Sequence, residues 1–179
     1  MSKNANFQQD QYFYLDRSSY ETALKEINEL VDSDVSGKDP YERVWIPENQ
    51  VTGQLKKIDQ DTFLKVERIF NESLLPTIEE NTGLSNLELV GVRKNTLNSG
   101  DLVSAHGDTL GYVLLIDIPD GSSVYEGGNV IFKKDDDEVV ELGIEANDLL
   151  VAKCTNEHGV SRVTKGQRES LAFFAKPRD

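Results

Sequence analysis

Residues 148–175 read DLLVAKCTNEHGVSRVTKGQRESLAFFA, and the fold assignment depends on the pattern in this stretch. Short apolar runs are separated by polar residues and by glycines. Runs of this length between turn-forming residues are typical of strands. The stretch therefore predicts strands at 148–153, 159–163 and 169–175.

The same pattern extends upstream as far as Leu84. Further strands are predicted at 87–95, 102–105, 111–118, 129–133 and 139–142. Turn sequences separate them, among them Asn98-Ser99-Gly100 and Pro119-Asp120-Gly121. About eight short strands with no helix between them predict a sandwich or a barrel in this half of the chain.

The first half of the chain shows helical spacing instead. A short aromatic strand is predicted at 12–15, and an amphipathic helix follows it that opens with a capping box at Ser18. A second amphipathic helix is predicted with Asp61 as its N-cap and with an interruption at Pro76.

Composition restricts the classes of function. The chain has 179 residues, of which 37% are hydrophobic and 28% charged, and its net charge is −13. This size and balance indicate a globular protein with its own core. The acidic balance argues against a nucleic-acid-binding protein and against docking on anionic membranes, because both need clustered basic residues. No apolar run is long enough for a membrane span, and the single cysteine, Cys154, excludes an internal disulfide, so a cytoplasmic location is expected.

The chain contains two histidines, His106 and His158, and both lie in the strand-rich half. Asp108 follows His106 at two positions, and residues two apart on a strand point to the same face. A later strand that brings His158 alongside completes a 2-His-1-carboxylate group, which suits ferrous iron and leaves open coordination positions. The same residue types also bind zinc, and either histidine alone is most simply a surface residue.

Both histidines belong to longer motifs with defined spacing. Residues 158–171 match the pattern H-x-V-x-x-V-x-x-G-x-R-x-S-L at every named position. Gly100 precedes His106 by six residues, Glu126-Gly127-Gly128 has the sequence of an E-G-G turn, and residues 145–151 read as the strand before the second histidine. Together these motifs resemble the 2-oxoglutarate- and iron(II)-dependent dioxygenases, in the prolyl-4-hydroxylase-like branch. The resemblance covers roughly half of the chain.

The resemblance implies the fold. The expected class is α+β, with a double-stranded β-helix (a cupin-like jelly roll) and N-terminal helices packed on one of its sheets. Residues 1–179 then form a single domain. Residues 1–86 are expected to be a helical and strand support region, and residues 87–179 the jelly-roll catalytic core.

The resemblance also implies the roles of individual residues. His106, Asp108 and His158 are the expected catalytic Fe(II) ligands. Arg168 stands where the family binds the distal carboxylate of 2-oxoglutarate, a task that suits a permanently charged, forked guanidinium. Ser170 is expected to add a hydroxyl contact, and Tyr112 either reaches the co-substrate or packs in the core.

The cofactors expected from the resemblance are Fe(II), 2-oxoglutarate as co-substrate and O₂, with ascorbate as a reductant. Leu97 departs from the family, since many members have a tyrosine at this position, and some co-substrate contact must then come from elsewhere. Arg93, Trp45 and Tyr41 are the expected substrate contacts. The irregular segment 37–59 is either a connecting strand or a lid beside the pocket.

The implied activity is hydroxylation of an unactivated C–H bond, with release of succinate and CO₂. The expected substrate is an amino acid, a peptidyl residue or a small natural-product intermediate. Asp108 favours hydroxylation over halogenation, because halogenating members lack this carboxylate. Two other functions remain open from the sequence: a non-catalytic jelly-roll module that binds a metal or ligand, and a zinc hydrolase on a cupin-like barrel.

Overall fold

The computed structural model describes residues 6–33, 41–42, 54–56, 58–109, 111–118 and 125–178. The helices are α1 (Phe7–Asp10), the 3-10 helix η1 (Arg17–Tyr20), α2 (Glu21–Ser33), α3 (Gln60–Ser73) and α4 (Leu75–Thr82). The strands are β1 (Tyr12–Asp16), β2 (Tyr41–Glu42), β3 (Gln54–Lys56), β4 (Leu87–Asn98), β5 (Val103–His106), β6 (Val113–Asp117), β7 (Glu126–Gly127), β8 (Val130–Lys133), β9 (Val139–Leu142), β10 (Asp148–Lys153), β11 (His158–Val160), β12 (Val163–Lys165) and β13 (Gln167–Pro177).

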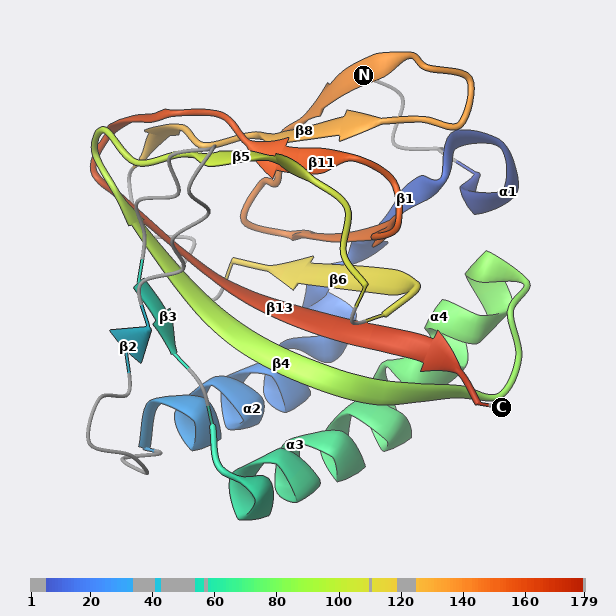
Figure 1. Ribbon diagram of the computed structural model, residues 1–179. Coiled ribbons are helices and arrows are strands. Elements are labelled where there is room, and N and C mark those ends of the chain that lie inside the picture. Colours follow the sequence, from blue (N-terminus) through green and yellow to red (C-terminus); the bar gives the residue numbers. More distant parts are fainter. Residues whose placement is uncertain are drawn as a thin grey trace.

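The strands of the described ranges form antiparallel sheets (Figure 1). A seven-stranded sheet has the order β1-β10-β6-β13-β4-β3-β2, and a four-stranded sheet has the order β5-β11-β8-β9. A small third sheet pairs β12 with β7. The longest ladder joins β4 to β13 and runs from the pair Gln167–Asn98 to the pair Pro177–Leu87. The molecule is therefore mixed α/β with antiparallel sheets, and the prediction of a strand-rich second half is confirmed.

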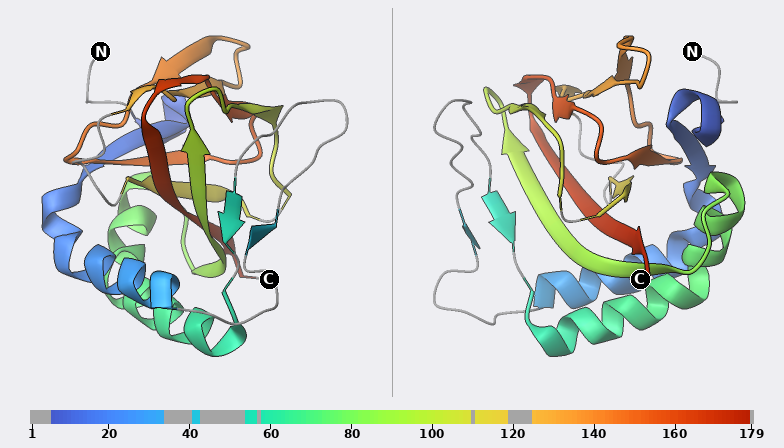
Figure 2. Two further views of the ribbon diagram at one scale, coloured as in Figure 1. Left: turned by 90° about the vertical axis from the view of Figure 1, so that its left-hand side faces the viewer. Right: turned by 45° about the vertical axis from the view of Figure 1, so that its right-hand side comes forward.

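The layers follow from the alternation of side chains along the large sheet. Leu171 and Phe173 of β13 join the core between this sheet and helices α2 and α3. Ala172 and Phe174, one residue further on, join a second core that also contains Phe132 of the four-stranded sheet. The two faces of one strand thus serve two cores. Figure 2 shows the same order, with the helices beneath the large sheet and the smaller strands above it.

The helix starts differ from the sequence prediction in their caps. The first helical segment begins with η1, and the Asp16 carboxylate caps it by accepting from the Ser18 backbone N–H at 3.0 Å. Ser18 is therefore not the cap. The second helix is capped by Asp59, which accepts from the Thr62 N–H at 2.7 Å, and not by Asp61. In both places an acidic residue two positions earlier already stands in extended backbone, the conformation that a cap requires.

Two strands also differ from their predicted bounds. The predicted strand 159–163 is divided into β11 and β12, because the chain leaves the four-stranded sheet after Val160 and enters the small sheet at Val163. Strand β4 extends to Asn98, because β13 pairs with it along its whole length. Most of segment 37–59 lies outside the described residues, so its predicted role as a strand or lid stays a prediction. None of the helices in the described ranges is long and apolar enough to span a membrane.

Candidate metal centre

The two histidines lie directly opposite each other on neighbouring strands. His106 ends β5, His158 begins β11, and the antiparallel register pairs them. Their ring centroids are 4.7 Å apart. The close approach of the two strands depends on Gly159, because a Cβ there would stand 2.5 Å from the carbonyl oxygen of Val103. The fold therefore brings together two residues that are fifty positions apart in the sequence.

Each imidazole is oriented by the backbone carbonyl two residues before it. Nδ1 of His106 lies 2.8 Å from the backbone oxygen of Ser104, and Nδ1 of His158 lies 2.8 Å from that of Asn156. A carbonyl oxygen only accepts, so each Nδ1 carries the proton and donates it. The Nε2 atoms are then left with free lone pairs. This arrangement is the usual one for metal-binding histidines, whose other ring nitrogen is held by a hydrogen bond.

Asp108 completes the group. Its carboxylate oxygens lie 3.2 Å from His158 Nε2 and 3.7 Å from His106 Nε2. Its backbone N–H donates to the carbonyl of Cys154 at 2.8 Å. Gly107 allows this turn, since a Cβ there would be 2.9 Å from the Thr155 carbonyl oxygen. Backbone contacts therefore direct the carboxylate back towards the histidines.

The geometry of this group fits one metal ion. The ligand atoms of His106, Asp108 and His158 all lie within 4.8 Å of one another. Two ligand atoms about 2.1 Å from an ion and at right angles to each other are about 3 Å apart, so small side-chain shifts close the site. Burial raises the pKa of Asp108, but the neighbouring His158, His106 and Arg93 outweigh it and hold this pKa below its usual value. Asp108 is therefore ready as an anionic ligand.

Arg168 is a buried arginine on the face of the seven-stranded sheet that points towards the four-stranded sheet. It lies on β13 opposite Leu97 and shares a strand face with Ser170, Ala172 and Phe174, which points between the two sheets. It is only 2% exposed. Its Nη1 donates to Ser170 Oγ at 3.0 Å, whereas its buried Nε has no partner among the described residues. Within those residues no carboxylate forms an ion pair with it.

A buried guanidinium without an anion is costly, because removing a charge from water is favourable only when the charge is paired. This burial lowers the pKa of Arg168, and the hydrogen bond and charge of Tyr125 oppose the shift. An arginine nevertheless stays charged at any physiological pH. The arrangement therefore has the chemistry of an anion-binding site.

Tyr125 is the functional candidate that the sequence analysis did not assign. It precedes the Glu126-Gly127-Gly128 turn and packs against the core between the sheets. Gly128 lies in the left-handed region (φ +67°), and a Cβ there would stand 2.9 Å from Arg168 Cδ and 3.6 Å from Tyr125 Cδ2. The E-G-G motif was visible in the sequence, but its contact with Arg168 depends on this close backbone approach.

The expected role of Tyr112 in co-substrate binding is not supported. Tyr112 lies before the first residue of β6, so the alternation that places Leu114 between the sheets does not extend to it. It packs instead against the helix-side core, and the Lys153 ammonium lies 5.7 Å from its ring centroid. Its backbone N–H binds Ala175, seven residues along β13 from Arg168 and hence more than about 20 Å away. Of the two alternatives in the sequence, core packing applies.

Of the three predicted substrate contacts, only Arg93 has a side chain within the described part of the structure. Arg93 lies opposite Ala172 on the face between the sheets, with its guanidinium 5.0 Å from the Phe174 ring centroid. Its charge acts on Asp108, which places it on the side of the metal-binding group. Trp45 lies outside the described residues. Tyr41 belongs to β2, and only its backbone is described.

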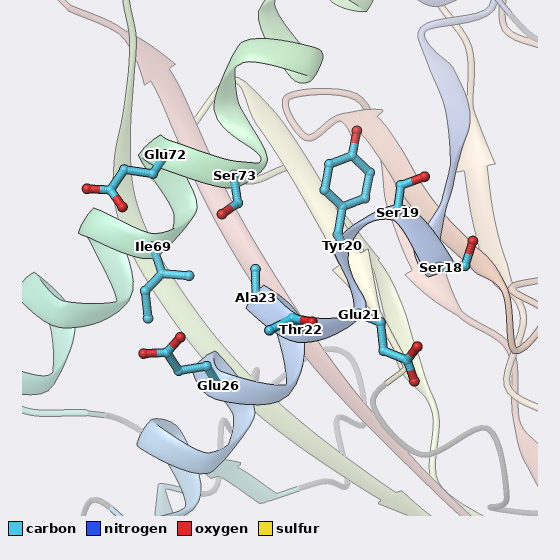
Figure 3. Close-up of a pocket in the computed structure, with 10 residues that line it drawn as sticks. All are labelled: Ser18, Ser19, Tyr20, Glu21, Thr22, Ala23, Glu26, Ile69, Glu72 and Ser73. Atoms are coloured by element: carbon cyan, nitrogen blue, oxygen red, sulfur yellow. The ribbon is translucent and has the colours of Figure 1, made fainter.

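A surface pocket on the helical layer is separate from this centre (Figure 3). It lies between the start of α2 and the end of α3, and it is lined by Tyr20, Glu26, Ile69 and Glu72 among others. None of the predicted site residues contributes to it. The candidate functional site is therefore the region between the two sheets, on the opposite side of the large sheet from this pocket.

Comparison with known proteins gives a fold but no relative by sequence. No family model matches the chain, and no curated protein matches it either. Among solved structures, an oxidoreductase of the 2OG-Fe(II) oxygenase family from Burkholderia pseudomallei has a TM-score of 0.76 at 12% identity, over 94% of this chain and 85% of the other. This chain has the fold of the 2-oxoglutarate- and iron(II)-dependent oxygenases.

Two further structures of this class match nearly the whole chain. A Pseudomonas putida prolyl-4-hydroxylase has a TM-score of 0.69 at 14% identity, over 96% of this chain and 95% of the other. HygX from Streptomyces hygroscopicus, solved with nickel and 2-oxoglutarate bound, has a TM-score of 0.65 at 11% identity, over 96% and 84%. The neighbours thus include the prolyl-hydroxylase branch expected from the motifs.

Proposed function

We propose that this protein is a 2-oxoglutarate- and Fe(II)-dependent dioxygenase that hydroxylates an unactivated C–H bond. In this proposal His106, Asp108 and His158 hold Fe(II), and Arg168 and Ser170 bind the distal carboxylate of 2-oxoglutarate. A double-stranded β-helix, the finer form of the observed fold, is part of the proposal. The carrying observation is the buried, unpaired guanidinium of Arg168 in a fold that also juxtaposes a 2-His-1-carboxylate group.

The metal-binding group and Arg168 are both chemically consistent with one bound dicarboxylate. Two neutral imidazoles and one carboxylate leave a divalent ion with net positive charge and open positions, the donor set of non-haem Fe(II) oxygenases. When bound, Fe(II) and 2-oxoglutarate activate O₂ and release succinate and CO₂. Arg168 needs an anion that the described part of the chain does not supply, and a dicarboxylate chelated at the metal would supply one. A zinc hydrolase or a surface histidine cluster gives no reason for such an arginine.

The surrounding residues bind, orient and exclude water. Nδ1 of each histidine stays on its backbone carbonyl and keeps Nε2 directed at the ion. Apolar side chains of the second core, including Leu114, Ile116 and Phe174, line the space between the sheets. Excluding water there strengthens the pairing of Arg168 with a carboxylate, because charges interact more strongly at low dielectric.

Arg93 is a proposed substrate contact on the same side of the large sheet as the metal group. Its guanidinium lies over Phe174 and has no ion-pair partner among the described residues, so its donors are available to a substrate carboxylate or carbonyl. Trp45 and Tyr41 remain proposed substrate contacts from the sequence alone. The substrate class is an amino acid, a peptidyl residue or a small natural product, and ascorbate is proposed as the reductant.

The test is an anaerobic titration of metal-free protein with Fe(II) and 2-oxoglutarate, monitored by the visible charge-transfer band of the chelate. The wild-type protein is expected to give a band that needs both additions. Asp108→Ala should lose the band, and Asp61→Ala, which removes an exposed carboxylate on α3, should keep it. A folded wild-type protein that binds Fe(II) without the band on addition of 2-oxoglutarate contradicts the proposal.

A further inference from the structure

The guanidinium of Arg168 contacts two hydroxyl side chains, those of Ser170 and Tyr125. We propose that Tyr125 is a co-substrate-binding residue, and that its phenolic O–H donates to the same distal carboxylate that Arg168 binds. The inference rests on the proposed function, because the carboxylate is that of 2-oxoglutarate. It assigns a residue that neither the sequence motifs nor the resemblance placed in the site.

The hydrogen-bond directions around Arg168 carry the argument. Ser170 Oγ accepts from Nη1 at 3.0 Å, and Tyr125 also forms a side-chain hydrogen bond to this guanidinium. A guanidinium only donates, so both hydroxyl oxygens act as acceptors there. Each hydroxyl then retains its own hydrogen for another acceptor. The unpartnered Nε–H of Arg168 is a further donor in the same place.

These donors match one carboxylate. Two ionised carboxylate oxygens offer about four lone-pair sites and no donor. Once their mutual hydrogen bonds are made, the Nε–H of Arg168 and the hydroxyl hydrogens of Ser170 and Tyr125 remain as donors. A neutral ligand would leave the guanidinium unpaired, so the cluster selects an anion.

The opposite strand explains why the phenol is needed. Leu97 pairs with Arg168 across β4 and β13, is 1% exposed, and offers no hydrogen-bond donor. Val163, which would lie 3.1 Å from a Cβ on Gly128, is apolar as well. Tyr125 is thus the residue beside the guanidinium that supplies a hydroxyl from outside β13. It provides the contact that the leucine at position 97 cannot provide.

The backbone supports this placement of Tyr125. Gly128 lies in the left-handed region and has no room for a Cβ against Arg168 Cδ. Its N–H donates to the carbonyl of Arg162 at 3.2 Å, which fixes the turn against the strand that leads to Arg168. The tyrosine ring is held by the second core. Because the turn and the core both hold Tyr125, its side chain loses little conformational entropy when the hydroxyl binds a ligand, and more of the hydrogen-bond energy then contributes to affinity.

The experiment compares Tyr125→Phe with Tyr112→Phe, which removes an equivalent hydroxyl on the helix-side core. The anaerobic chelate titration is performed with 2-oxoglutarate and with 2-oxopentanoate, which has the same 2-oxo acid end but no distal carboxylate. Tyr125→Phe is expected to weaken 2-oxoglutarate binding by about ten- to a hundredfold, the effect of one hydrogen bond to a charged group. Its affinity for 2-oxopentanoate should be that of the wild type. Tyr112→Phe should bind both ligands as the wild type does.

Three outcomes overturn the inference, and they differ from one another. Equal 2-oxoglutarate affinity of Tyr125→Phe and the wild type shows that the hydroxyl is not a contact. An equal loss for both 2-oxo acids shows that Tyr125 only supports the fold of the site. A wild-type protein that retains Fe(II) by metal analysis but forms no chelate with either acid refutes the proposed function, and the role of Tyr125 with it.

Discussion

Replacing Arg168 by methionine should separate a binding role from a structural one, because a structural role predicts a much larger loss of stability. Methionine keeps an unbranched, flexible side chain in the space between the sheets and removes the charge. In the metal-free protein the guanidinium has no carboxylate partner among the described residues, so the wild type carries an uncompensated burial cost. The substitution removes that cost.

The expected change in stability is small. Replacing buried ionic groups by apolar residues is neutral or stabilising by about 1–4 kcal/mol. Against this, Ser170 and Tyr125 each lose a hydrogen-bond partner, at about 1 kcal/mol each. The free energy of unfolding of metal-free Arg168→Met should therefore lie within about 2 kcal/mol of that of the wild type, on either side. An arginine that was a paired structural element would instead cost about 3–5 kcal/mol when removed.

The expected change in co-substrate binding is large and unfavourable. A guanidinium that grips a carboxylate by two charge-assisted hydrogen bonds contributes about 3–6 kcal/mol, taken as 1.5–3 kcal/mol for each bond. At about 1.4 kcal/mol for each factor of ten, the dissociation constant for 2-oxoglutarate should rise by roughly two to four powers of ten. The affinity for Fe(II) should change little, because Arg168 is not one of the metal-binding residues.

Urea unfolding of the metal-free proteins and the anaerobic chelate titration measure the two effects on the same preparations. Arg168→Lys is the matched control, since it keeps the charge and loses the forked geometry; it should show a smaller loss of 2-oxoglutarate affinity than methionine. A variant that is destabilised by 3 kcal/mol or more, yet binds 2-oxoglutarate as tightly as the wild type, would refute the anion-site reasoning.

Three further predictions concern the metal-binding group and its surroundings. Asp108→Asn should lower Fe(II) affinity more than about a hundredfold by metal analysis, because the only anionic ligand becomes neutral, and tight binding in this variant would exclude the triad. Arg93→Met should raise the KM for substrates that carry a carboxylate beside the reacting carbon more than for neutral ones, as measured by succinate release; equal effects on both would exclude a charge contact. Burial raises the pKa of the Cys154 thiol to about 12 from 9.0, so this thiol should react with a disulfide reagent only after unfolding. The free energy of unfolding should also fall as the pH rises above about 9, because the thiol of the unfolded chain ionises first. Fast labelling of the folded protein would contradict this prediction.

Much of the architecture could be predicted because it depends on local periodicity. The alternation of Leu171, Ala172, Phe173 and Phe174 is readable as a strand buried on both faces, and both faces are indeed cores. The grouping of His106 with Asp108 was predictable from their close spacing at a strand end, although Asp108 lies beyond β5 and is directed by the turn at Gly107. His158 then lies opposite His106 because the strand that it begins, β11, pairs with β5.

The parts that could not be predicted depend on backbone geometry outside regular strands. The side of the sheet on which Tyr112 packs could not be predicted, because Tyr112 precedes β6 and strand alternation does not extend to it. Tyr125 was overlooked because its contact with Arg168 requires a left-handed glycine at position 128. The helix caps at Asp16 and Asp59 were missed because several acidic and hydroxyl residues near each helix start can serve equally well.

The two halves of the site lie on different sheets, and this has a consequence for ligand choice. His106 and His158 belong to the four-stranded sheet, whereas Arg168 belongs to the seven-stranded sheet. The distance between the metal group and the guanidinium is therefore set by the side chains packed between the sheets, such as Phe132 and Phe174. Close-packed cores resist changes of even one methylene in volume. If the proposed function holds, this core fixes the chain length of the dicarboxylate that can bridge metal and arginine, so core residues that touch neither end of the ligand contribute to its selection.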